Sequence, residues 1–247
     1  MSREFDPKQP EWMDRVDSAS AEHERTMRSL GELNRRFGAH RLLEYFLALW
    51  WNPNRCYRVL DLCTGGGDLP RAMVEWARPR GITLRIDAVD ANEHTLTIAR
   101  RLSEGYPEIH FVQGDALKFE PAESFDLVHC SLVLHHFPEQ DAARLLRRCR
   151  EHSTRWVLVS DLERNPFTAF CVWVGTGLMP KDPVLVHDGR ESAKRAFSFR
   201  EMRALAEAAG WSEFGHSRFL WCRQALWLDR RDFAEIPVEP VEMPIPA

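Results

Sequence analysis

The amino-acid sequence contains no long apolar run. A membrane-spanning helix needs about 18 to 20 apolar residues, and every apolar stretch here is interrupted by polar or charged residues before that length. The polar start of the chain, MSREFDPKQPEWMDR, also lacks the apolar core of a secretory signal peptide. We therefore expect a cytoplasmic protein without a membrane span.

Paired cysteines and an excess of basic residues are also missing. The six cysteines include no C-x-x-C pair, so the sequence indicates neither a zinc site nor a disulfide framework. The net charge of −4 argues against general affinity for nucleic acid, although it leaves a local basic patch open. The remaining composition, 44% hydrophobic and 28% charged, is typical of a globular protein with an ample core.

The stretch from Arg58 to Pro70, RVLDLCTGGGDLP, is the most informative part of the sequence. Its apolar start predicts a strand buried on both faces, and the glycines that follow predict a turn. Asp68 can then cap a helix whose Leu69, Met73 and Trp76 recur at helical spacing. This order is typical of the ligand crevice of a doubly wound sheet. The alternatives are an ordinary structural turn and a dinucleotide site, but the G-x-G-x-x-G spacing of the latter is absent.

The segment V-L-D-L-C-T-G-G-G-D resembles motif I of the class I S-adenosylmethionine (SAM)-dependent methyltransferases, whose usual form is D-x-G-x-G-x-G. Gly65 and Gly67 match the second and third glycines of this motif, and Cys63 stands in place of the first. Ubiquinone- and menaquinone-pathway methyltransferases similarly tolerate a small residue there. The resemblance implies that these three residues, together with the preceding Asp61, bind SAM.

A second acidic residue ends the next predicted strand, residues 82–90. In a doubly wound sheet, an acidic side chain at the carboxyl edge of this strand accepts hydrogen bonds from ribose hydroxyls. We assign this role to Asp90, with Ala91 beside it in the cofactor site. Asp87 is the competitor, but it lies inside the strand.

A third acidic residue follows a short predicted strand at residues 109–112. In the resembled family, the acidic residue after the third strand accepts the exocyclic amine of adenine, and the next residue offers its backbone amide to the ring. The resemblance implies these roles for Asp115 and Ala116. A nicotinamide enzyme has no obvious need for this third position, so the combination favours SAM.

Residues 125–137, FDLVHCSLVLHHF, resemble the fourth strand and following loop of small-molecule methyltransferases. The resemblance places Ser131 at the carboxyl edge of that strand, near the methionine part of SAM, and His135 and His136 where the loop meets the donor. A histidine can take up a proton near neutral pH, so either could serve as the base for a phenolic acceptor. A shared structural or donor-shaping role for both remains the alternative.

A long apolar and aromatic segment, residues 162–197, follows the fifth predicted strand at residues 155–160. Connections at the carboxyl ends of strands form the crevice in this fold class, so we expect a helical lid over a substrate pocket. His187 is our first candidate for an acid or base, with Arg190 to hold an anionic oxygen. A structural role for His187 is the alternative. A membrane-surface role for the segment is less favoured, because it lacks a face rich in lysine and arginine.

The whole chain is expected to form one methyltransferase domain. Its fold would be α/β, a Rossmann-like, doubly wound, mostly parallel sheet of seven strands with a terminal antiparallel hairpin. The expected parts are a flexible arm (1–17), a helical cap (18–51), the SAM-binding core (56–161), the lid (162–197), a last helix and hairpin (198–230) and a disordered tail (234–247). The tail could pack on a neighbouring copy in a homodimer.

The predicted function is in-line transfer of a methyl group from SAM to an oxygen or carbon of a small aromatic, polyketide-like or quinol-like acceptor. No metal is expected, because the sequence shows no recognisable ligand cluster. The alternatives are a nucleic-acid or protein methyltransferase, a non-catalytic SAM-binding protein and a nicotinamide oxidoreductase. The acidic balance and the absence of an N/D-P-P-Y tetrapeptide disfavour a nucleic-acid substrate.

Overall fold

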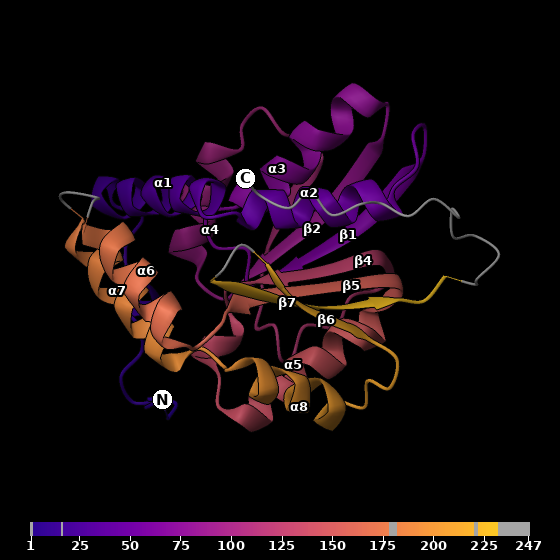
Figure 1. The fold of residues 1–247 in the computed structure, drawn as a ribbon. Coiled ribbons are helices and arrows are strands. Elements are labelled where there is room, and N and C mark those ends of the chain that lie inside the picture. Colours follow the sequence, from indigo (N-terminus) through magenta and orange to yellow (C-terminus); the bar gives the residue numbers. More distant parts are fainter. Residues whose placement is uncertain (1, 16, 178–181, 220–221, 232–247) are drawn as a thin grey trace, which may run out of the picture.

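The computed structural model describes residues 2–15, 17–177, 182–219 and 222–231. These form a seven-stranded sheet with the order β3-β2-β1-β4-β5-β7-β6. The strands are β1 (Cys56–Leu62), β2 (Thr83–Asp90), β3 (Ile109–Gln113), β4 (Phe125–Ser131), β5 (Ser153–Leu162), β6 (Gly215–Phe219) and β7 (Arg223–Asp229). The first five run parallel, and the last two form an antiparallel hairpin beside β5. The predicted fold class is confirmed (Figure 1).

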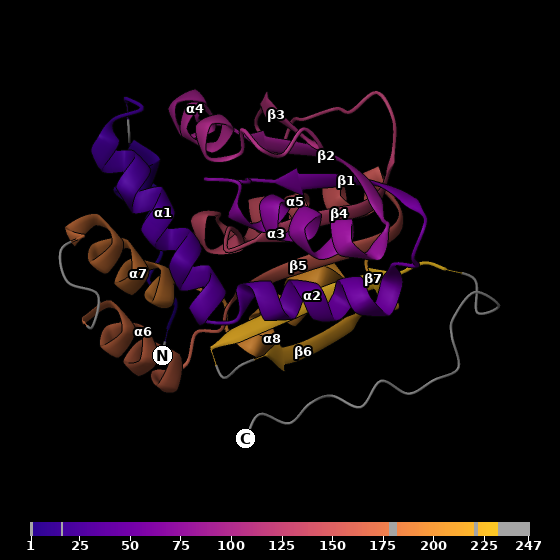
Figure 2. The ribbon, with the colours of Figure 1, turned by 90° about the horizontal axis from the view of Figure 1, so that it is seen from above.

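Helices cover both faces of this sheet (Figures 1 and 2). They are α1 (Ala21–Arg36), α2 (Ala39–Trp50), α3 (Asp68–Ala77), α4 (Glu93–Leu102), α5 (Glu139–His152), α6 (Pro166–Gly177), α7 (Pro183–Arg195) and α8 (Phe199–Ala208). The side chains of α2 and α3 pack on one face in a core that includes Trp50, Met73 and Trp156. Those of α5 and α8 pack on the other, around Leu145 and Met202. Burial on both faces explains the continuous apolar runs in the central strands.

The central strand β1 lies at the point where the strand order reverses. It pairs with β2 on one side and with β4 on the other. Its Val59, Leu60 and Leu62 are at most 1% exposed, as expected for a strand covered by helices on both faces. Connections leave the carboxyl ends of β1 and β4 in opposite directions, and such a switch point opens a crevice for ligands.

Gly38 separates the N-terminal helices α1 and α2, and α1 lies across the carboxyl ends of the strands (Figure 2). Asp68 differs from its predicted role. The N-cap of α3 is Gly67, and Asp68 is the first helical residue. Its carboxylate instead accepts a hydrogen bond from Asn34 Nδ2 at 3.0 Å, which fastens α1 to α3. A carboxylate in the first turn still interacts favourably with the helix dipole.

The insertion after β5 folds as the helix pair α6 and α7, which lies beside α1 (Figure 2). On α6, Phe167, Phe170 and Trp173 remain 45 to 60% exposed. Among the described residues, no helix is long and apolar enough to cross a membrane. The predicted disordered tail, residues 234–247, lies outside the described residues.

Glycine is required at the start of β6. Gly215 pairs with Trp227 of β7, and a Cβ at this position would overlap the indole ring. We expect Gly215→Ala to lower the free energy of unfolding by about 2 kcal/mol, because overpacking forces the ring out of its place. Urea denaturation measures the change. In the control Gly105→Ala, where a Cβ meets nothing within 4 Å, the change should stay within about 0.5 kcal/mol. Equal midpoints for both variants would contradict the packing.

Candidate functional site

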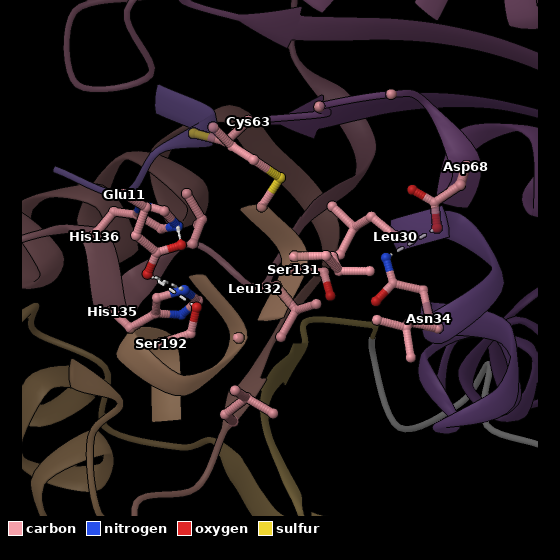
Figure 3. Close-up of a pocket in the computed structure, with 18 of the residues that line it drawn as sticks. Glu11, Leu30, Asn34, Cys63, Asp68, Ser131, Leu132, His135, His136 and Ser192 are labelled. Carbon is pink, nitrogen blue, oxygen red and sulfur yellow. Dashed lines mark hydrogen bonds and ion pairs between the residues drawn. The ribbon is translucent and has the colours of Figure 1, made fainter. Parts of the chain in front are cut away.

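A cavity of about 510 Å³ lies above the carboxyl ends of β1, β2 and β4 (Figure 3). Its floor comes from the segments that follow these strands, and its roof from the N-terminal segment, α1, α6 and α7. Most of the exposed lining is apolar. The polar residues that line it include Glu11, Asp14, Asn34, Asp61, Asp90, Ser131, His135, His136 and Arg223. Parts of the chain that are far apart in the sequence therefore close one space around a few polar groups.

Asp90 joins two of the turns in the floor. Its Oδ2 accepts a hydrogen bond from the Gly65 amide at 2.9 Å, and its Oδ1 accepts one from the Asn92 amide at 3.0 Å. Burial raises the pKa of the Asp90 carboxyl, although these two amides act in the opposite direction. Each carboxylate oxygen can accept a further hydrogen bond, so Asp90 can hold both turns and still receive hydroxyl donors from a ligand.

The glycine turn leaves room for a ligand at the position that the sequence predicted. Gly65 has φ +53°, and a Cβ there would meet nothing within 4 Å. Cys63 also has a left-handed φ of 59°. Burial and the neighbouring Asp90 and Asp61 raise the pKa of the Cys63 thiol, which keeps it neutral. The open backbone at Gly65 beside the Asp90 carboxylate fits a nucleoside whose ribose offers hydroxyl groups.

Asp61 is tied to a residue that sequence reasoning missed. Its Oδ1 lies 2.5 Å from His129 Nδ1 of the adjacent strand β4, and both side chains are buried. The two positions face each other in the parallel register of β1 and β4. The nearby Ser131 hydroxyl lies 2.9 Å from that of Ser160. These pairs fix the polar groups beneath the cavity.

A cluster of histidines and carboxylates forms one end of the cavity (Figure 3). His135 Nδ1 lies 2.7 Å from Asp161 Oδ1, and His136 Nδ1 lies 2.9 Å from Asp14 Oδ2. The Nε2 atoms of both rings face Glu11. Each of these atoms is 3.8 Å from a different oxygen of its carboxylate. We call these five residues the His–carboxylate cluster.

Electrostatics at His136 are dominated by the carboxylates around it. Burial alone would lower the pKa of His136, but the hydrogen bond with Asp14 and the charges of Glu11, Asp14 and Asp161 outweigh burial and raise the pKa to about 9. Burial would likewise raise the pKa of Asp161, yet its contacts with His135 lower it.

The N-terminal segment supplies Glu11 and Asp14, although the sequence predicted a flexible arm there. Glu11 is 1% exposed, and its Oε1 accepts a hydrogen bond from the Ser192 hydroxyl at 2.9 Å. The fully buried Asp188 accepts the amides of Trp12 and Met13, each at 2.9 Å. These buried contacts give the segment a fixed course over α7. The motif H-D-G-x-x-S is the part of the sequence that could have indicated this contact, because Asp188 and Ser192 are one helical turn apart and lie on the same face of α7.

The opposite end of the cavity contains a buried cation that the sequence did not indicate. Arg223 is 4% exposed, and its Nε and Nη2 donate to Phe37 O and Asn34 Oδ1 at 3.0 and 3.2 Å. Its Nη1 has no hydrogen-bond partner among the described residues. Burial lowers the pKa of Arg223 to about 10, although Asp161 and Asp68 act in the opposite direction.

The structure brings eight of the predicted site residues to this cavity: Asp61, Cys63, Gly65, Asp90, Ala91, Ser131, His135 and His136. Gly67, Asp115 and Ala116 are outside its lining. The exposed Asp115 carboxylate accepts the Leu117 amide at 2.9 Å and lies 3.0 Å from Lys118 Nζ. Ala116 is part of the core beneath.

His187 is not where an acid or base was expected. It lies outside the cavity lining, stacked on Trp12 with 3.9 Å between ring centroids, and its Nδ1 is 2.8 Å from Asp188 Oδ1. Arg190 is exposed and likewise outside the lining. The reason is helical geometry. Gly189 and Ser192 lie on the face of α7 that lines the cavity, whereas His187 and Arg190 lie on other faces of the same helix. His187 instead helps to hold the N-terminal segment.

Asp188 should control the position of the N-terminal segment. We expect Asp188→Ala to increase the rate of trypsin cleavage at Arg15 at least fivefold, because two amides lose a buried acceptor, at about 1–3 kcal/mol per group. Timed digestion followed by mass spectrometry measures the rate. In the control Asp6→Ala, the lost carboxylate is exposed and binds only Lys8 and Gln9 within the same segment, so the rate should change little. Equal rates for the two variants would contradict the anchoring role of Asp188.

Comparison with known proteins gives one family match. Residues 59–154 match the family described as "Methyltransferase domain". A 2-phytyl-1,4-naphtoquinone methyltransferase of Thermosynechococcus vestitus is 38% identical over 81 residues, which are 33% of this chain and 35% of the relative. A ubiquinone biosynthesis O-methyltransferase of Bordetella avium is 30% identical over 158 residues, 62% of this chain and 61% of the relative. The chain thus spans about one third to three fifths of the length of these two relatives.

Solved structures share the fold at low sequence identity. The plantazolicin methyltransferase BpumL, in complex with S-adenosylhomocysteine (SAH), has a TM-score of 0.62 and 13% identity, covering 84% of this chain and 90% of that one. Human N-acetylserotonin methyltransferase, in complex with SAM, has a TM-score of 0.60 and 19% identity, covering 83% and 55%. These similarities concern the fold, and they extend beyond residues 59–154.

Proposed function

We propose that this protein is a SAM-dependent methyltransferase of small molecules, because residues 59–154 match the family described as "Methyltransferase domain" and the described chain has the class I fold. The family match supports the recognition made from motif I. One observation carries the proposal: Asp90 binds the Gly65 amide at the switch point of the sheet, in a cavity that continues to a polar cluster. The cavity therefore has room for a donor and an acceptor side by side.

The donor half would be formed by the turns after β1, β2 and β4. SAM, when bound, supplies a methyl group that its positively charged sulfur already activates. Asp90 would accept the ribose hydroxyls beside Ala91, and Asp61, Cys63, Gly65 and Ser131 would surround the methionine part. The family resemblance assigns the adenine to Asp115 and Ala116, with Gly67 in the turn. In this arrangement the Asp115 carboxylate would exchange its contact with Lys118 for the adenine amine.

The acceptor half would lie between the His–carboxylate cluster and the apolar roof. The roof contributes Leu33 of α1, Phe37 directly after that helix, Val172 of α6 and Leu185 of α7. An apolar space with a few convergent polar groups suits a small, flat molecule that carries a hydroxyl group. The names of the two relatives support a quinone-type or phenolic acceptor, with oxygen as one methyl-accepting atom.

Alignment would be the main contribution of the protein to the rate. Fixing the reacting atoms about 3–3.5 Å apart and in line removes much of the entropic barrier. His135 and His136 would orient the acceptor, because their rings point into the cavity and are held by Asp161 and Asp14. The roof of α1, α6 and α7 would exclude water from the nucleophile. Release of SAH from SAM only in the presence of a phenol or quinol from a panel of acceptors tests the activity.

Asp90 should contribute more to SAM affinity than Asp115. We expect Asp90→Ala to weaken SAM binding at least tenfold, because ribose hydroxyls lose their acceptor and the Gly65 turn loses its anchor, at about 1–3 kcal/mol per bond. Asp115→Ala should weaken binding by less than about threefold, since that carboxylate is exposed and already engaged by Leu117 and Lys118. Isothermal titration calorimetry with SAM gives both affinities.

The unfolding transition of each variant, followed by circular dichroism, shows whether the turn remains folded. Unchanged SAM affinity in folded Asp90→Ala would remove the ribose role from this residue. A larger loss in Asp115→Ala than in Asp90→Ala would place the nucleoside farther toward β3.

A further inference from the structure

We infer that Glu11, His135 and His136 form a binding site for one divalent metal ion that accepts nitrogen ligands, such as Zn²⁺, Fe²⁺ or Co²⁺. The site lies at the proposed acceptor end of the cavity. One ligand atom from each of these residues lies within 4.8 Å of the others. Glu11 and His135 are buried, and His136 is 23% exposed toward the cavity. Figure 3 shows the three side chains turned toward one another.

The orientation of the two imidazoles is that of metal ligands. Each Nδ1 is engaged by a carboxylate, Asp161 for His135 and Asp14 for His136, at 2.7 and 2.9 Å. A histidine that binds a metal through one ring nitrogen usually donates the other N–H to a carboxylate or carbonyl oxygen, which fixes the tautomer and the ring. The tautomer with a proton on Nδ1 leaves the Nε2 lone pair of both rings free and directed at the space beside Glu11.

The separations leave a gap of the right size for an ion. Each Nε2 lies 3.8 Å from the nearest Glu11 oxygen, which is too far for a hydrogen bond. Zinc–ligand distances of about 2.0–2.2 Å in a tetrahedral site place neighbouring ligand atoms about 3.4 Å apart. A small inward shift of the three side chains would therefore bring their ligand atoms within coordination distance of one ion.

The local charge also calls for a cation. Glu11, Asp14 and Asp161 carry three negative charges, and Arg195, 3.9 Å from Glu11 Oε1, offsets one of them. A divalent ion bound at His136 Nε2 would displace the proton that the raised pKa of His136 implies there, and would itself offset the other two charges. Two imidazoles and one carboxylate suit Zn²⁺, Fe²⁺ or Co²⁺ better than Mg²⁺, which prefers oxygen ligands.

The remaining coordination position would face the cavity. There the ion could bind the hydroxyl oxygen of an acceptor and lower the pKa of that hydroxyl, as bound metals do for water. This role rests on the proposed function, whereas metal binding itself does not. The sequence analysis expected no metal, because Glu11 and His135 are 124 residues apart and meet only in the folded chain.

Metal titration of the full chain tests the site. Protein stripped with EDTA and dialysed should bind one Zn²⁺ per chain with a Kd of about 1 µM or lower, as measured by equilibrium dialysis and elemental analysis. Co²⁺ should give the visible absorption of an ion with nitrogen ligands. Glu11→Gln, His135→Ala and His136→Ala should each weaken binding at least tenfold, and Asp14→Asn about tenfold through the orientation of His136.

His216→Ala is the matched control, because His216 lies on β6, outside the cavity lining, and its loss should leave the affinity unchanged. Thermal unfolding confirms that each variant is folded. Absence of stoichiometric binding, or equal affinity in the cluster variants and the control, would overturn the site and leave a hydrogen-bonded network of histidines and carboxylates.

SAM titration of the same samples separates the two proposals. SAM binding and methyl transfer that persist at full rate in EDTA, with no Zn²⁺ bound by the protein, would overturn the metal site alone. Stoichiometric Zn²⁺ binding that the cluster variants abolish, in a chain that does not bind SAM, would support the metal site and overturn the proposed function.

Discussion

The site depends on one buried carboxylate that lies outside it. Asp188 accepts two consecutive backbone amides of the N-terminal segment and thereby brings Glu11 and Asp14 to the histidines after β4. A fully buried carboxylate is costly unless it is hydrogen-bonded, so the two amides and Asp188 stabilise one another. The arrangement of the polar end of the cavity follows from this contact, because the sheet alone supplies neither Glu11 nor Asp14.

The proposed donor half of the cavity and the His–carboxylate cluster are built in different ways. The donor half follows from the sheet: β1 and β2 are neighbours in register, and Asp90 at the end of β2 reaches the Gly65 turn after β1. Its geometry is determined by a local motif on a rigid scaffold. The His–carboxylate cluster instead combines the N-terminal segment with residues from the middle of the chain, so its geometry depends on long-range packing.

This difference explains what the sequence could predict. The seven strands, their carboxyl-edge residues and the terminal hairpin follow from apolar runs, turns and the motif I resemblance, and the structure has them in that order. The direction of His187 could not be predicted, because it depends on which face of α7 meets the cavity. The partners of Glu11 and Arg223 could not be predicted either, since no local pattern relates residues that approach each other only through tertiary packing.

Under the proposed function, the roof of the cavity would link the entry of a substrate to the assembly of the reactive site. Glu11 belongs both to the covering over the cavity and to the polar cluster within it. Any movement of the N-terminal segment that admits a bulky molecule would therefore also move Glu11 and Asp14 away from the two histidines. The proposed site would be complete only while the N-terminal segment covers the cavity. The rate at which this segment opens and closes would then set an upper limit on the turnover rate.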